Sequence, residues 1–134
     1  PFELTGVEQY ENPEHMDRLM EILGAEAVPW SYKTDCCGAS LVMTRTDIVV
    51  KLSQRILSTA LEAGADCFVT GCTMCHANLD TRQAGLPVQD GRSTIPVFYF
   101  TELMGLAMGH KDAAKWLSHH LTDPIKLLSG KGLL

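Results

Sequence analysis

Cys67-Phe68-Val69-Thr70-Gly71-Cys72-Thr73-Met74-Cys75 is the stretch of this 134-residue chain that decides its fold. Residues 67–70 are apolar or β-branched, and this composition favours a short buried strand. Gly71 predicts a sharp turn, and the residues from Cys72 onward predict a helix that runs to about Gln83. A strand that leads directly into a helix is the unit from which parallel sheets are built.

The alternation of helices and strands continues on both sides of this stretch. The further predicted elements are, in chain order, a helix over 14–23, a strand over 27–32, a loop over 34–40, a helix over 46–63, a surface loop over 85–94, a strand over 95–100, helices over 101–107 and 112–121, and a weakly specified tail beyond Pro124. This order predicts an α/β fold, a three-layer domain with a mainly parallel sheet covered by helices.

Composition limits the classes of protein to which the chain can belong. Its formal charge of −5 argues against a nucleic-acid binder, which needs a basic surface. No apolar run approaches the length of a membrane span. The five cysteines, an odd number, favour a reducing compartment such as the cytoplasm. We expect residues 1–134 to form a single domain and, since the first residue is Pro1, to be a piece of a longer protein.

Four of the five cysteines form two tight clusters, Cys36-Cys37-Gly38 and Cys72-Thr73-Met74-Cys75. Each cluster follows a predicted strand, so both should lie at the carboxyl edge of the parallel sheet, where ligands bind. Thiolates bind soft metals, and adjacent cysteines bridge to each other only with strain. We therefore predict one shared metal site, formed by Cys36, Cys37, Cys72 and Cys75.

Local sequence features support this site. Cys72 and Cys75 begin a predicted helix, where the helix dipole and free N–H groups favour the thiolate form. Gly38 and Gly71 lack a side chain, so that we expect the backbone to approach a bulky ligand closely there.

The other reactive side chains have simpler interpretations. Cys67 lies in an apolar strand and is expected in the core. We expect His76 to lie beside the metal site or on the surface rather than to bind the metal. We expect His119-His120 to lie at a solvated helix end, because adjacent residues of a helix do not face the same way. Lys33 and Arg45 flank the first cluster; as a secondary possibility they receive an anionic substrate.

The residues around both clusters resemble the cysteine-rich CCG domain found in the B subunit of heterodisulfide reductase. The segments that carry the resemblance are Tyr32-Lys33-Thr34-Asp35-Cys36-Cys37-Gly38-Ala39-Ser40-Leu41, Thr44-Arg45-Thr46-Asp47 and Gly71-Cys72-Thr73-Met74-Cys75-His76-Ala77-Asn78-Leu79-Asp80, with weaker support from Tyr10-Glu11-Asn12-Pro13 and Ile95-Pro96-Val97-Phe98-Tyr99-Phe100-Thr101. Related CCG domains occur in thiol:fumarate reductases and in other anaerobic electron-transfer complexes.

The resemblance implies a function as well as a fold. It implies that Cys36, Cys37, Cys72 and Cys75 are catalytic residues and ligands of a noncubane [4Fe-4S] cluster, with zinc as the alternative metal. The parent protein would relay electrons within a multisubunit oxidoreductase and reduce a disulfide, such as that joining coenzyme M and coenzyme B. Its partners would be a flavin-containing subunit, a small iron–sulfur subunit and a second CCG domain.

The family pattern includes one further cysteine upstream of Cys36, and residues 1–35 contain none. We therefore expect the C-terminal CCG domain of a two-domain subunit, without its first strand and first cysteine, incompletely loaded with metal and inactive by itself. The sequence leaves three alternatives open: an iron–sulfur relay, a closed zinc site in an interaction module, and thiol–disulfide exchange by Cys72 and Cys75.

Overall fold

The computed structural model describes residues 11–86, 88 and 91–134. Tyr10 and part of the loop predicted over 85–94 lie outside these residues. The helices are α2 (His15–Ile22), α3 (Thr46–Glu62), α4 (Thr73–Thr81), α5 (Phe100–Ala107), α6 (Ala113–Leu117) and α7 (Ile125–Gly130), with a 3-10 turn, η1, at Ala39–Leu41; the strands are β1 (Phe68–Thr70) and β2 (Val97–Tyr99).

The two strands of the described residues pair in parallel, with Phe68 opposite Val97 and Thr70 opposite Tyr99. Since α4 connects them, β1–α4–β2 is the strand–helix–strand unit that the sequence predicts. The α/β fold is therefore confirmed, although the sheet is smaller than expected.

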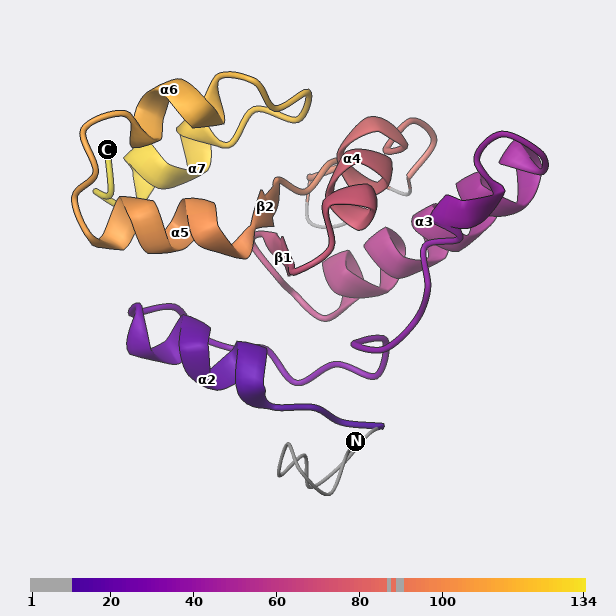
Figure 1. Ribbon diagram of the computed structural model, residues 1–134, viewed down its shortest axis with the longest axis horizontal. Helices are drawn as coiled ribbons and strands as arrows, with labels where there is room; N and C mark the ends of the chain where they lie inside the picture. Colours follow the sequence, from indigo (N-terminus) through magenta and orange to yellow (C-terminus); the bar gives the residue numbers. More distant parts are fainter. Residues whose placement is uncertain (1–10, 87, 89–90) are drawn as a thin grey trace.

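Neighbouring residues of β2 face opposite sides of the sheet, as the pleat of a strand requires. Val97 packs in a first core with residues of α3 and α4, including Leu57 and Leu79. Phe98 packs in a second core with Leu117 and Leu128. Figure 1 shows this layering, with α3 and α4 on one side of the strands and α5, α6 and α7 on the other.

The strand predicted over 27–32 is wrong. Residues 31–34 form a turn in which the Asp35 N–H donates to the Tyr32 carbonyl at 3.2 Å, so the backbone bonds locally rather than to the sheet. Pro29 has no N–H to offer a neighbouring strand. Trp30 instead packs against the first core, with its ring 5.3 Å from that of Phe68.

The C-terminal end also departs from the prediction. The helix expected over 112–121 ends at Leu117, and the expected tail contains α7. Asp123 Oδ1 accepts the Ile125 N–H at 2.9 Å, at the start of α7, and Leu128 is buried against Phe98. A short helix of this kind is stabilised by burial of an apolar face rather than by length.

Gln83 links α4 to the approach of β2. Its side-chain amide donates to the Ile95 carbonyl at 2.7 Å and accepts from the Ile95 N–H at 2.8 Å. All of these groups are buried, so the amide replaces the backbone partner that Ile95 would have in a wider sheet. Over the part of the chain that the structure describes, none of the helices has the length and apolar character needed to cross a membrane.

Candidate metal centre

Cys72 and Cys75 are positioned by the turn between β1 and α4. Thr70 Oγ1 accepts the Cys72 N–H at 3.1 Å, and Cys72 is the N-cap of α4. The Tyr99 hydroxyl donates to the Gly71 carbonyl at 3.2 Å and ties this turn to the end of β2. One turn of helix then brings the side chains of Cys72 and Cys75 to the same side of α4.

Cys36 and Cys37 come from the loop that precedes η1. Gly38 has a left-handed backbone (φ +75°), and a Cβ there would lie 2.9 Å from Leu52 Cδ1, so this turn requires glycine. The turn directs Cys37 into the first core, where only 1% of it is exposed. Cys36 is exposed, and its Sγ accepts a hydrogen bond from the Gly38 N–H at 3.3 Å.

The two cysteine motifs meet at Cys37 and Cys75, whose sulfur atoms lie 3.2 Å apart. Asn78 Nδ2, one turn further along α4, donates to Cys37 Sγ at 3.6 Å. The structure thus brings Cys37, Cys72 and Cys75 together. Among these three, Cys37 is buried, Cys75 is half-buried and Cys72 is exposed, so the group has a buried side and an open side.

The protons of these thiols are held unequally. The backbone N–H of Cys75, and then its thiol, stabilise the Cys72 thiolate and hold the pKa of Cys72 below its usual value. Burial, and then the neighbouring thiols of Cys37 and Cys72, raise the pKa of Cys75 to about 12. Cys72 is therefore the more acidic thiol of this pair, and Cys75 would have to lose a proton for a metal to bind.

Two expectations about this region are wrong. Cys36 and Cys37 do not follow a strand, because residues 27–32 form none; only the second cluster lies at the carboxyl end of one, β1. The space beside each glycine is also taken by the protein rather than left for a ligand. Leu52 fills it at Gly38, and Met16 Cε lies 3.3 Å from a Cβ built at Gly71.

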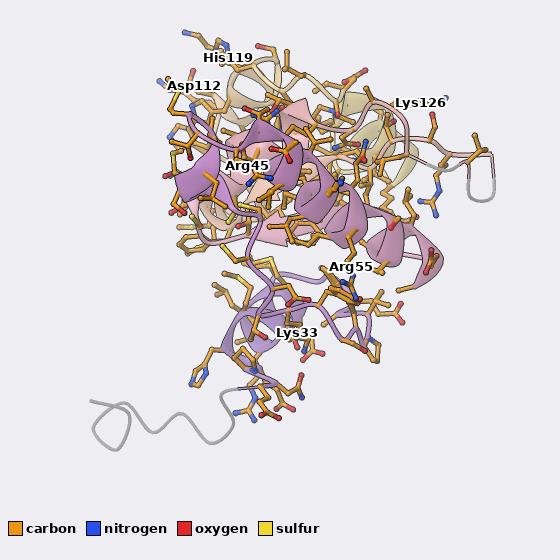
Figure 2. All side chains as sticks on the ribbon, turned by 90° about the vertical axis from the view of Figure 1, so that its right-hand side faces the viewer. Lys33, Arg45, Arg55, Asp112, His119 and Lys126 are labelled. Carbon is orange, nitrogen blue, oxygen red and sulfur yellow. The ribbon has the colours of Figure 1, made fainter. Side chains whose placement is uncertain are left out.

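The two cations that flank the first cluster are paired with carboxylates. Lys33 bonds to Asp17 on α2, and Arg45 bonds to Asp47 at 2.9 Å. The guanidinium of Arg45 holds the pKa of Asp47 below its usual value. Figure 2 labels both cations among the side chains. Each already has an anionic partner, which weakens the case for either as a substrate anchor.

Cys67 lies apart from this centre. It precedes β1 and packs against the second core, on the side of the sheet that carries Phe98. Burial raises the pKa of its thiol to about 11. The position agrees with the expected core role, and the high pKa keeps the side chain a neutral thiol.

A further group of polar side chains was missed by sequence reasoning. His76, Glu102 and His120 converge from α4, α5 and the segment after α6, with His120 Nε2 3.0 Å from Glu102 Oε1. The solvated position predicted for His120 is wrong, since 2% of its side chain is exposed, whereas His119 is exposed as expected. The burial of His120 could not be predicted from the local sequence, because it depends on a contact between distant residues. The Asp80 carboxylate accepts the N–H groups of Leu121 and Thr122 and so holds the segment after α6 against α4.

The chain is similar to known proteins over most of its length. The family model of the CCG cysteine-rich domain matches residues 5–80. The chain is 31% identical to the 8-methylmenaquinol:fumarate reductase membrane anchor subunit of Wolinella succinogenes over 91% of its own length and 43% of the relative's. It is 30% identical to the B subunit of the ferredoxin:CoB-CoM heterodisulfide reductase of Methanosarcina mazei, over 89% of its length and 41% of the relative's.

A protein of Archaeoglobus profundus that is itself similar to the B subunit of heterodisulfide reductase is 33% identical over 73% of the chain and 34% of the relative. The chain thus spans less than half the length of these curated relatives. The matched residues 5–80 contain both cysteine clusters and the turn that joins β1 to α4. The chain therefore belongs to the CCG family of cysteine-rich domains, as the resemblance of its two motifs to the heterodisulfide reductase B subunit predicts.

Proposed function

We propose that Cys36, Cys37, Cys72 and Cys75 bind an iron–sulfur cluster of the [4Fe-4S] type, through which this domain relays electrons in a multisubunit oxidoreductase. The observation that carries the proposal is the 3.2 Å separation of Cys37 Sγ and Cys75 Sγ, which come from segments 38 residues apart. Thiols brought this close without a disulfide are a donor set for a soft metal.

The surroundings of the sulfurs fit such a group. The lowered pKa of Cys72 favours the thiolate form, which is the form that binds metal. Asn78 Nδ2 donates to Cys37 Sγ at 3.6 Å, and hydrogen bonds to sulfur tune the potential of a cluster. When bound, the cluster supplies one-electron transfer. The chain would hold it against the core through Cys37 and would leave it open to solvent at exposed Cys72.

The substrate and the partners are proposed from the relatives. A disulfide is the substrate that the names of the heterodisulfide reductase subunits support. We propose a flavin-containing subunit and a small iron–sulfur subunit as electron donors, in the cytoplasm. Because the chain covers 41% of the M. mazei subunit, we also propose that it forms one CCG domain, the C-terminal one, of a subunit with a second CCG domain.

The test is anaerobic reconstitution of the 134-residue chain with iron and sulfide, followed by metal and sulfide analysis and electron paramagnetic resonance. The proposal is supported if the chain forms a cluster, if Cys37→Ser and Cys75→Ser abolish it, and if Cys67→Ser retains it. Iron that binds equally to all three variants refutes it. The chain could instead purify with one tightly bound zinc and take up no iron after the zinc is removed. This result would refute the iron–sulfur proposal in favour of the structural zinc module.

The disulfide substrate needs its own assay. The domain within the full-length subunit, together with its electron-donating subunits, should reduce the disulfide of coenzyme M and coenzyme B, and Cys37→Ser should abolish this activity. If a loaded cluster is present and a panel of disulfides is not reduced, the electron-relay role stands and the substrate assignment is wrong.

A further inference from the structure

We propose that His76, Glu102 and His120 form a second metal site, separate from the cysteines, that takes a divalent cation of the zinc type. The three residues come from α4, α5 and the segment that follows α6, and their ligand atoms all lie within 4.8 Å of one another. Two imidazole nitrogens and one carboxylate oxygen form a donor set that zinc uses in proteins.

The distances are close to those of a metal site. Glu102 Oε1 lies 3.0 Å from His120 Nε2, and Glu102 Oε2 lies 3.9 Å from His76 Nε2. Around a tetrahedral cation with bonds of about 2.0–2.2 Å, ligand atoms lie roughly 3.3–3.6 Å apart. Side-chain movements on the order of 1 Å therefore bring all three atoms to one cation.

Two of the three side chains, Glu102 and His120, are largely buried, unlike those of an ordinary surface cluster of polar residues. The exposed fractions of the side chains are 17% for Glu102 and 2% for His120. A carboxylate withdrawn from water is stabilised by a cation at hand. The Tyr99 N–H donates to Glu102 Oε2 at 2.8 Å and fixes the carboxylate, while the His120 ring packs 5.0 Å from that of His76 and 5.8 Å from that of Phe98.

This site faces away from the cysteine centre although Cys75 and His76 are neighbours. Successive residues of an α-helix project about 100° apart, so the two side chains leave α4 in different directions. Cys75 meets Cys37, whereas His76 Nε2 donates to the Val97 carbonyl of β2 at 3.0 Å. To bind a cation through Nε2, the ring adopts its other tautomer, with the proton on Nδ1, and the hydrogen bond to Val97 is lost.

The site has room for a further ligand. Three protein ligands satisfy three of the four positions around a zinc-type cation and leave one for water or for an incoming molecule. The side chain of His76 is 25% exposed, so this is the side by which solvent reaches the site.

Cobalt titration of the unmodified 134-residue chain tests the proposal, since Co²⁺ reports the type of ligand. The cysteines should take the first equivalent and give sulfur-to-cobalt charge-transfer absorption. A second equivalent should add ligand-field bands without further charge-transfer absorption. His76→Asn and His120→Gln should each weaken this second step by more than about tenfold and leave the first unchanged.

His119→Gln is the matched control, because His119 is the neighbouring residue in sequence but is exposed, at the upper edge of Figure 2. It should leave both steps unchanged. Circular dichroism of the metal-free variants checks folding; if His120→Gln unfolds the chain, the more exposed His76 still decides the question. The absence of a second step in the parent chain, or its survival in folded His76→Asn, overturns the proposal.

Discussion

At the scale of single residues, three cysteines of the chain differ in burial and in pKa. Cys37 is almost fully buried in the first core, Cys72 is exposed with a lowered pKa, and Cys67 is a half-buried thiol that packs against the second core. The same residue type thus supplies a buried thiol, an exposed thiol of lowered pKa and a packing group. Each role leads to a measurement that distinguishes it from the others.

Replacement of individual cysteines should separate ligands from core residues. Cys37→Ala and Cys72→Ala should each lose most of the bound metal, because each removes one thiolate of the centre. Cys67→Ala should keep the metal content of the parent, since Cys67 packs against the second core. Metal analysis of the purified variants is the measurement. Equal losses in all three variants would contradict the assignment of Cys67 to the core.

Alkylation of the metal-free, reduced chain should follow the pKa order of the thiols. The rate of reaction with iodoacetamide rises with pH as the thiolate forms. Cys72, whose pKa is lowered, should therefore react at lower pH than Cys67, whose pKa is about 11, and Cys75, whose pKa is about 12. Peptide mass spectrometry across a pH series measures the three profiles. Coincident profiles would contradict the thiolate assignment of Cys72.

At the scale of elements, the central helices and strands are predicted well, and the segments on either side of them less well. The helix expected over 46–63 is α3, and the strands expected over 67–70 and 95–100 contain β1 and β2. Residues 27–32 show alternation but form no strand, because Pro29 and the packing of Trp30 outweigh it. The position of His120 depends on contacts with Glu102 and α4, which no local pattern encodes.

Gln83 should be a strong determinant of how α4 joins the sheet. Gln83→Ala leaves the N–H and carbonyl of buried Ile95 without partners, at a cost of about 2–4 kcal/mol in the free energy of unfolding. Gln54→Ala is the matched control. Its side chain donates to the Ala84 carbonyl at an exposed site, so the cost should stay below about 1 kcal/mol. Urea unfolding measures both, and similar costs would contradict the role of Gln83.

At the scale of the whole molecule, the cysteine centre joins parts of the chain that are far apart in sequence. The loop before η1 and the start of α4 meet at Cys37 and Cys75, which are 38 residues apart, and both lie against the first core. The sequence predicts that the two cysteine motifs meet, because both motifs are distinctive. It does not predict which sulfurs are buried, since that depends on how the loop closes over Leu52 and the rest of α3.

Metal binding should therefore stabilise the entire domain. A ligand at a thousandfold excess over its Kd adds about 4 kcal/mol to the free energy of unfolding, which corresponds to a rise in Tm of roughly 10 °C or more. Scanning calorimetry with and without metal measures the shift, and hydrogen exchange should slow in the residues around Cys37 and in α4. Cys37→Ser should abolish both effects. An unchanged Tm of the parent chain after metal addition would contradict the prediction.

The burial of Cys37 beside exposed Cys72 has a consequence for the order of events. A group held between them has apolar core behind it and solvent in front, so other molecules reach it from a single direction. An electron donor and an electron acceptor that both need direct contact would compete for the same small area. They would then bind one after the other, rather than simultaneously on opposite sides of the domain.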